Sequence, residues 1–176
     1  SAEEVLPWTQ KALELAERLS RPQVLASCYN DLGTLSLKSG EFEKTSKYYE
    51  QGLKISLENN LVGNAITLYN NLSNLYWSIG EFQKVFEFAQ KGSELARKVG
   101  SLYGLVWVDI MLAASYALMG EMQKAISICE DALALAKRTK HIAGISNAMF
   151  GLGVCYQILG EWDKSLQYLM EARDIA

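Results

Sequence analysis

One short motif returns along the chain at a fixed interval of 40 residues. It reads Gly, Glu, a bulky apolar residue, any residue and Lys, and it begins at Gly40, Gly80, Gly120 and Gly160. Such a constant spacing over four copies is typical of one supersecondary element that has been copied and stacked. The interval therefore restricts the fold to a repeat architecture before any single helix or strand is assigned.

The composition is that of an ordinary globular protein. The 176 residues are 49% hydrophobic and 21% charged, and the net charge of -3 comes from 17 basic and 20 acidic residues spread along the chain. Because no basic stripe is present, nucleic acid is not expected as a direct partner. The most apolar stretch, 104–119, contains Asp109 and is shorter than the ~20 residues that span a bilayer. No contact with a membrane is expected either.

The cysteines and the histidine give no sign of a metal centre or a disulfide framework. Cys28, Cys129 and Cys155 form no C-x-x-C pair, and His141 is the single histidine. We expect buried thiols in a reducing, cytoplasmic compartment, with no metal and no cofactor. Catalysis is not expected, since the sequence has no Gly-rich phosphate loop and no clustered acid–base pair.

Each repeat contains two helical patterns of apolar residues that are separated by the motif glycine. The first copy shows the pattern before Gly40, at Leu25, Cys28, Tyr29, Leu32 and Leu35. This spacing places one apolar face on a helix. The second pattern ends near a small residue, which recurs at 52, 92, 132 and 172 and lets another backbone approach closely. Each repeat therefore predicts a helical hairpin.

The motif itself is expected to form the corner between the two helices. Gly40 can take the left-handed conformation just past the first helix, and Glu41 can lie in the first turn of the next one, where the helix dipole favours an acid. The bulky residue, Phe42 in this copy, is expected to close the corner. Lys44 follows Glu41 by three positions, a surface pairing worth roughly 0.2–0.5 kcal/mol. The motif thus predicts a structural role at the corner rather than a catalytic or ligand-binding one.

The spacing divides the chain into one half repeat and four whole ones. We expect a single solenoid over 1–176 with about nine helices. The half repeat is at 1–20, and the whole repeats are at about 21–60, 61–100, 101–140 and 141–176. The chain begins in mid-repeat, so we expect a piece of a larger protein whose array is uncovered at both ends. Apolar side chains such as Leu6 and Trp162 would then promote end-to-end self-association.

These residues carry a pattern that resembles the tetratricopeptide repeat. Leu32-Gly33 in the first helix, Tyr76 ahead of the corner, the Gly-Glu corner and the small residues of the second helix all have counterparts in that family. The resemblance covers nearly the whole chain, although the period is 40 and no Pro closes the second helix. It implies an all-α, right-handed superhelical α-solenoid of antiparallel helical hairpins.

The longer period and the Asn-rich first helices resemble two branches of this family. One branch is the Pins-type cell-polarity adaptors, whose concave surface holds extended peptides. The other is the MalT-type transcription regulators, in which the array senses an effector and drives assembly. The resemblance therefore implies either a peptide-binding adaptor or an effector-sensing regulatory segment.

In repeats of this family the first helix of each hairpin lines the concave surface. The positions there that lie outside the apolar stripe are mostly hydrogen-bonding in the first two repeats and mostly apolar in the last two. An Asn amide presents a donor and an acceptor together, which suits the backbone of an extended peptide. The candidate partner-binding residues are Asn30, Asn70, Asn71, Asn74, Trp77, Trp107, Ile110 and Phe150.

Other interpretations of these residues stay open. An Asn on a helix surface is often only solvated, and the large apolar candidates can instead be buried against a neighbouring turn. Asp109 stands where Tyr29 and Tyr69 stand in earlier repeats, so it is expected either at the rim or hydrogen-bonded in a structural role. Only Lys38 is basic among the concave positions, which makes a free C-terminal carboxylate a poor ligand.

The leading hypothesis is a non-catalytic protein–protein interaction module that binds a peptide or a partner protein in its concave groove. The alternative is a structural or effector-sensing segment of a larger signalling or transcription-regulator protein.

Overall fold

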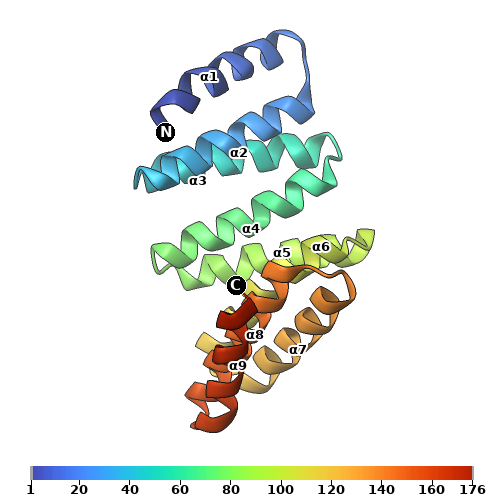
Figure 1. Ribbon diagram of the computed structural model, residues 1–176. Helices are drawn as coiled ribbons and strands as arrows, with labels where there is room; N and C mark the ends of the chain where they lie inside the picture. The colour runs from blue at the N-terminus through green and yellow to red at the C-terminus, as the bar shows by residue number, and fades with distance from the viewer. Residues whose placement is uncertain (1, 176) are drawn as a thin grey trace. The chain divides into compact units, whose positions relative to one another are not determined.

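The computed structural model describes residues 2–175, with side chains from Pro7 onward. This range contains nine α-helices and no strand (Figure 1), which confirms the all-α fold expected from the sequence. In chain order the helices are α1 (Ala2–Arg18), α2 (Pro22–Lys38), α3 (Phe42–Glu58), α4 (Val62–Ser78), α5 (Phe82–Val99), α6 (Leu102–Leu118), α7 (Met122–Arg138), α8 (Ile142–Ile158) and α9 (Trp162–Ile175).

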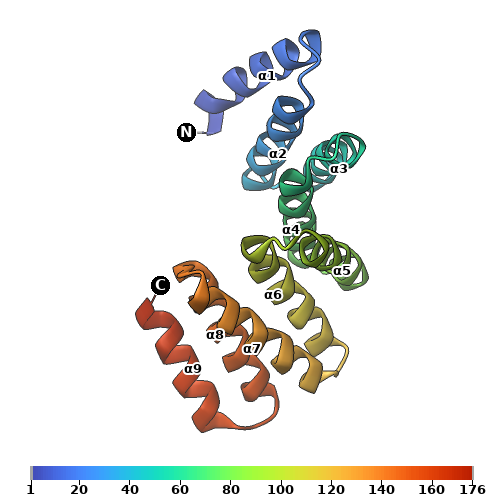
Figure 2. The same cartoon turned by 90° about the vertical axis from the view of Figure 1, so that its right-hand side faces the viewer.

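The described chain forms two compact units, an N-terminal unit of residues 1–81 and a C-terminal unit of residues 82–176. The N-terminal unit holds α1 to α4, and the C-terminal unit holds α5 to α9. Within each unit, helices that follow one another in sequence lie side by side (Figure 2). Contacts also join the first helices of neighbouring hairpins, α2 with α4 and α6 with α8. None of the described helices is both long and apolar enough to cross a membrane.

A residue in the left-handed conformation separates each helix from the next. Positive φ angles recur at 20, 40, 60, 80, 100, 120, 140 and 160. The motif glycines take φ values of 73° to 78°, which confirms their expected role as caps. The alternate corners contain Ser20, Asn60, Gly100 and Lys140, so three of them place a side chain where glycine is the usual choice.

Backbone hydrogen bonds close each corner and satisfy the last carbonyls of the helix. At the first motif, the Gly40 amide donates to the Leu37 carbonyl at 3.0 Å and the Glu41 amide donates to the Ser36 carbonyl at 2.9 Å. The second bond spans six residues and defines the Schellman motif. The same six-residue bond follows every helix from α1 to α8. The corners are therefore local structures that do not depend on distant contacts.

Two details of the motif differ from the sequence-based expectation. Glu41 is the N-cap of α3 rather than part of its first turn, and its carboxylate accepts a 2.8 Å bond from Lys44 instead of capping the helix. The bulky residue also does not close every corner: Met122 is 9% exposed, but Phe42 is 42% exposed. Phe82 and Trp162 hold the same position and are 45% and 65% exposed, so of the four described copies only the one at Met122 is covered by its neighbours.

The motif lysine also contacts the helix that precedes the corner. Lys124 Nζ lies 5.2 Å from the centroid of the Tyr116 ring, and Lys164 Nζ lies 5.0 Å from that of Tyr156. Both distances are within the range of a cation–π interaction. Each lysine is paired with the motif glutamate as well. In these two repeats the motif lysine therefore fastens the corner to the helix before it, a role that the sequence did not reveal.

Close packing between helices pairs a glycine with a large side chain. Gly33 on α2 faces the ring of Tyr49 on α3, and an added Cβ at this glycine would overlap the ring. Gly153 on α8 faces Leu169 on α9, where an added Cβ would lie 2.7 Å from the leucine Cδ2. These are the glycines of the Leu-Gly pairs, so the pairs mark places where two helices approach closely.

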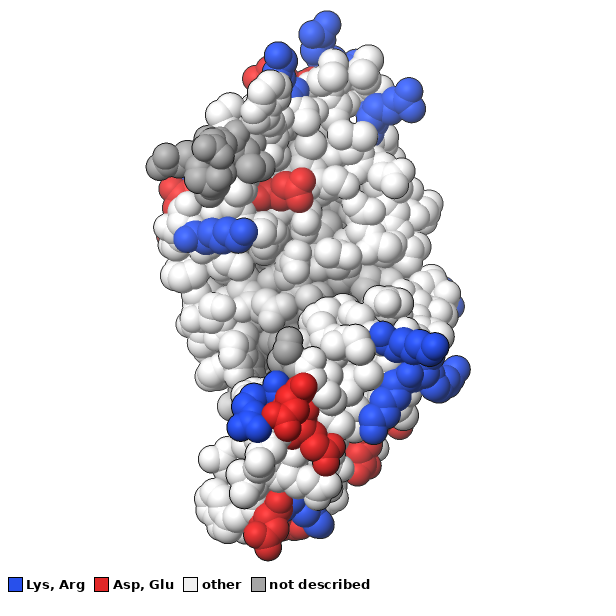
Figure 3. All heavy atoms as spheres, in the orientation of Figure 1, with Lys and Arg blue, Asp and Glu red and all other residues white. Residues whose placement is uncertain are grey.

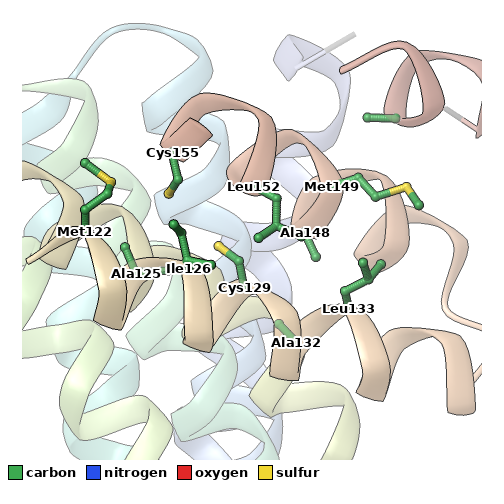
Figure 4. Packing of buried hydrophobic residues seen from close by; sticks show 12 residues of the cluster. Met122, Ala125, Ile126, Cys129, Ala132, Leu133, Ala148, Met149, Leu152 and Cys155 are labelled. Atoms are coloured by element: carbon green, nitrogen blue, oxygen red, sulfur yellow. The ribbon is translucent and has the colours of Figure 1, made fainter. Parts of the chain in front are cut away.

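The core of the C-terminal unit is built mainly from α7 and α8 (Figure 4). It includes Cys129 and Cys155 as free thiols, and Cys28 is a third buried thiol in the N-terminal unit, as the sequence predicted. A hydrogen bond with the Cys155 sulfur, together with burial, holds the pKa of Cys129 well above its usual range. This thiol therefore stays protonated at neutral pH.

The last helix exposes apolar side chains whose counterparts one repeat earlier are buried. Trp162 and Leu166 on α9 are 65% and 59% exposed. Met122 and Ile126 hold the same positions on α7, lie in the core cluster with side chains of α8, and are only 9% and 7% exposed. The difference arises because α8 packs on α7 and covers Met122 and Ile126. The side chain of Leu6, expected to be part of the uncovered N-terminal face, lies outside the described side chains.

Candidate functional site

The asparagines predicted from the sequence lie on two contacting helices of the N-terminal unit. Asn30 is on α2, and Asn70, Asn71 and Asn74 are on α4. The structure brings the first and third of them together, because Asn71 Nδ2 donates to Asn30 Oδ1 at 2.8 Å. Both side chains are half-buried. This bond, which we call the asparagine bridge, joins the first helices of two successive hairpins.

A polar hollow of about 240 Å³ opens beside the asparagine bridge. It is lined by Ser27, Asn30, Asp31, Gly63, Asn64, Thr67 and Leu68. Its volume is below the ~300–1,000 Å³ that is usual for small-molecule pockets. The hollow therefore suits a side chain or a short stretch of polypeptide better than a cofactor.

Hydrogen bonds hold the polar lining of the hollow in place. Asn64 Nδ2 donates to Ser27 Oγ at 3.3 Å, which is a second link between α4 and α2. The Thr67 hydroxyl donates to the Gly63 carbonyl within α4 at 3.1 Å. Asn64 was not predicted as a candidate, although it precedes Asn71 by seven positions and so lies on the same face of the helix. That spacing was the signal that could have identified it.

The remaining candidates of the N-terminal unit lie further along α4 and do not line the hollow. Asn74 Nδ2 donates to the Asn70 carbonyl at 3.0 Å, so this exposed amide is partly occupied by its own helix. Trp77 is 40% exposed in the last turn of the helix. These three side chains form an extension of the polar face rather than its centre.

Asp31 is the charged residue of the hollow. Its side chain is exposed, and its Oδ1 accepts a bond of 3.5 Å from Asn30 Nδ2, which is long for a hydrogen bond. Figure 3 has the orientation of Figure 1. In this view the surface over α2 and α4 is largely uncharged, with few Lys or Arg side chains. The local charge of the hollow is therefore negative.

The apolar candidates lie on the C-terminal unit and differ in exposure. Ile110 on α6 packs against the core cluster, which makes it part of the interior. Trp107 on α6 is half-buried, and its ring meets the His141 ring edge-on with centroids 5.1 Å apart. Phe150 on α8 is 59% exposed. Of these three side chains, Phe150 offers the most surface to a partner.

Asp109 belongs to a buried bridge between α5 and α6. Its side chain accepts hydrogen bonds from Ser93 Oγ at 2.5 Å and from Arg97 Nη2 at 2.6 Å, and the residue is only 4% exposed. Burial raises the pKa of this carboxyl, and the bonds from Ser93 and Arg97 offset part of that rise. The sequence allowed two interpretations of Asp109, at the rim or hydrogen-bonded, and the structure supports the hydrogen-bonded, structural role.

Titratable groups do not gather into a metal site in the part of the chain that the structure describes. No three His, Cys, Asp or Glu side chains there come within reach of a common ion. His141 Nδ1 is buried without a hydrogen-bond partner among the described residues, and its ring is covered by Tyr103 and Trp107.

Comparison with known proteins identifies the repeat. Residues 26–59 and residues 105–176 each match a family model described as tetratricopeptide repeat, and together these matches span more than half of the chain. No curated protein sequence matches the chain.

Solved structures with similar folds include BtubC (BKLC) from P. vanneervenii, with 23% identity, a TM-score of 0.83, and coverage of 99% of this chain and 72% of that one. A signal transduction ATPase with numerous domains (STAND) from Pyrococcus horikoshii, which has a tetratricopeptide repeat sensor, matches with 18% identity and a TM-score of 0.80 over 98% of this chain and 27% of that one. YrrB, described as a TPR protein with an unusual peptide-binding site, matches with 20% identity and a TM-score of 0.60 over 99% and 77%. From its repeat matches and its fold, the chain belongs to the tetratricopeptide-repeat family.

Proposed function

We propose that the chain is a non-catalytic interaction module that holds an extended peptide, or an extended segment of a partner protein, on the face formed by α2 and α4. The observation that carries this proposal is the polar hollow of about 240 Å³ beside the asparagine bridge. An extended segment presents unpaired N–H and C=O groups along its length. Amide side chains can satisfy both kinds of group.

The asparagine bridge prepares this face for a ligand. Asn71 Nδ2 uses one of its two hydrogens in the bridge, and Asn30 Oδ1 uses one of its two lone pairs. The other hydrogen and the other lone pair are positioned for a peptide backbone without any change of rotamer. Because the two side chains are already ordered, less conformational entropy is lost when the ligand binds.

The known structures of this fold are consistent with such a role. YrrB is described as having a peptide-binding site, and we extend peptide binding to this chain as part of the proposal. In the C-terminal unit, taken by itself, the exposed Phe150 is proposed as an anchor for an apolar side chain of a partner. A cytoplasmic location is also part of the proposal, since the described cysteines are buried free thiols.

A second candidate function is effector sensing within a larger regulator. It is favoured by the likeness to the STAND protein with a tetratricopeptide repeat sensor, of which this chain covers 27%. Under this alternative the same polar face binds an effector, and the bound state is passed to other domains. Occupancy of the face by a ligand is common to both candidates.

The test is a titration of the 15N-labelled chain with a pool of acetylated and amidated heptapeptides, followed by NMR. We expect shifts of the backbone and side-chain amides of α2 and α4. Asn71→Ala should weaken binding about 2- to 13-fold, as expected for one hydrogen bond of about 0.5–1.5 kcal/mol. The pair Asn70→Ala and Asn74→Ala should weaken it less, because neither residue takes part in the asparagine bridge beside the hollow.

Asn147→Ala is the matched control, since Asn147 is an exposed asparagine at the middle of α8 in the other unit. Thermal unfolding of each variant separates a binding defect from a loss of structure. If Asn71→Ala and the Asn70/Asn74 pair all bind with unchanged affinity, the ligand does not use this face. Shifts centred on Phe150 alone would move the site to the C-terminal unit.

A further inference from the structure

The hydrogen bonds of the hollow leave several of its acceptor oxygens free, although each amide group also keeps one unused hydrogen. The Asn64 amide donates to Ser27, the Thr67 hydroxyl donates to a backbone carbonyl, and the Asn71 amide donates to the asparagine bridge. Among the described residues, the bonds of Asn64 and Asp31 use Asn64 Nδ2 and Asp31 Oδ1, and leave Asn64 Oδ1 and Asp31 Oδ2 to a ligand. An incoming donor would therefore meet free acceptor oxygens, one of which belongs to the charged side chain of Asp31.

The charge of the lining has the same consequence. Asp31 is the one charged side chain among the lining residues, and no Lys, Arg or His lines the hollow. A carboxylate or phosphate placed there would meet the like charge of Asp31. A neutral amide would use one or two acceptors and leave the carboxylate without a counter-charge.

We propose that the hollow selects a cationic side chain of the bound segment, a lysine ammonium or an arginine guanidinium, with Asp31 as its charge partner. This inference rests on the proposed function, because it names the ligand group that the peptide-binding face takes. Lysine brings three donors and arginine five, and neither has an acceptor. A donor-only group of this kind complements a lining with free acceptors.

The shape of the hollow admits such a side chain. Gly63 contributes no side chain to the rim, and an added Cβ there would meet no atom within 4 Å. The hollow is therefore open on this side of α4. Leu68 is 1% exposed beneath the polar lining, so the floor is fixed by the core of the unit. A long aliphatic stem can enter along the open side while its charged end reaches Asp31.

The experiment compares two heptapeptide pools that are acetylated and amidated. Six positions vary among Ala, Ser, Thr and Val, and the central residue is Lys in one pool and Gln in the other. We expect the chain to bind the Lys pool about tenfold more tightly than the Gln pool in NMR titrations at low salt, as for one charge-assisted hydrogen bond. This preference should shrink at 0.5 M salt because the charges are then screened.

Three variants isolate the role of the charge. Asp31→Asn should reduce the preference for Lys to about onefold, and Asp31→Glu should retain most of it. Asp31 is exposed and accepts only one long bond, so both variants should fold as the parent does. Asp163→Asn changes an exposed acid of α9 instead and should leave the preference unchanged.

The outcomes separate this inference from the proposed function. If the Lys and Gln pools bind equally and both shift the signals of α2 and α4, the cationic preference is refuted and peptide binding stands. If neither pool shifts these signals, the proposed function is refuted, and the preference with it. Gly63→Leu should block both pools by filling the open side, and unchanged binding in this variant would place the ligand elsewhere.

Discussion

Gly120 allows the cost of a single backbone dihedral angle to be measured almost in isolation. Its φ is 78°, and a Cβ added there would meet no heavy atom within 4 Å, so Gly120→Ala introduces no steric overlap. The left-handed conformation costs an alanine roughly 1–2 kcal/mol. Alanine also restricts the unfolded chain, which returns about 0.4–1 kcal/mol. The free energy of unfolding should therefore fall by about 0.8 kcal/mol, and by no more than about 1.6 kcal/mol.

The same substitution at Gly63 is the matched control. Gly63 is also surrounded by open space, but it lies inside α4, where its φ is not positive. Gly63→Ala should raise the free energy of unfolding by about 0.5 kcal/mol, since alanine is the better helix former. The opposite signs of the two changes depend on backbone conformation alone.

Lys140 offers the reverse exchange. Its φ is 53° with a full side chain, so Lys140→Gly should relieve the strain and raise the stability by up to about 1 kcal/mol. Urea unfolding followed by far-UV circular dichroism measures all three variants. If Gly120→Ala and Gly63→Ala shift the urea midpoint in the same direction, the conformational argument is refuted.

Three further changes test the packing, the buried bridge and the exposed end. Gly33→Ala should cost about 1–3 kcal/mol of stability in urea unfolding, because the added methyl overlaps the buried ring of Tyr49. Burial raises the pKa of Asp109 in the folded state above its ordinary value of 3.8. The contribution of this raised pKa to the free energy of unfolding is therefore present below pH 3.8 and is lost as the pH rises through the folded pKa. The stability difference between the parent and Asp109→Asn should accordingly shrink from pH 4 to pH 7, and a difference that grows over this range would contradict the raised pKa. We expect the parent to self-associate with rising concentration in sedimentation velocity, and Trp162→Glu with Leu166→Glu to abolish this association. Equal association of parent and variant would exclude this face of α9, and a strictly monomeric parent would refute the expectation.

The repeat interval and the motif were enough to predict the fold. The Gly-Glu motif marks the end of one helix and the start of the next, and a helical period in between leaves few alternatives. The corners at Ser20, Asn60 and Lys140 were less visible, because no glycine marks them. Their left-handed conformation is imposed by the six-residue backbone bond that closes each corner. The residue type at the corner is only a weak signal of this conformation.

The residue types of the candidate site could be predicted from the sequence, but the hydrogen bonds that join these residues could not. Helical spacing places Asn30 and Asn71 on the first helices of their hairpins, and the structure joins them by a hydrogen bond. Which asparagine meets which depends on the axial offset between α2 and α4, and this offset is set by packing against α3. Sequence spacing within one helix carries no information about it. For the same reason the link from Asn64 to Ser27 was not predicted.

The regular placement of left-handed corners, one at every twentieth residue, also limits how such a chain can change length during evolution. A single residue inserted within a helix would rotate everything after it by about 100°, the turn per residue of an α-helix, and would move the buried stripe away from its neighbour. A residue inserted in a corner would break the six-residue bond that closes it. A duplicated or deleted hairpin, in contrast, leaves every later face in phase. Length variation among relatives should therefore occur in whole hairpins, each of which adds or removes one complete strip of the surface.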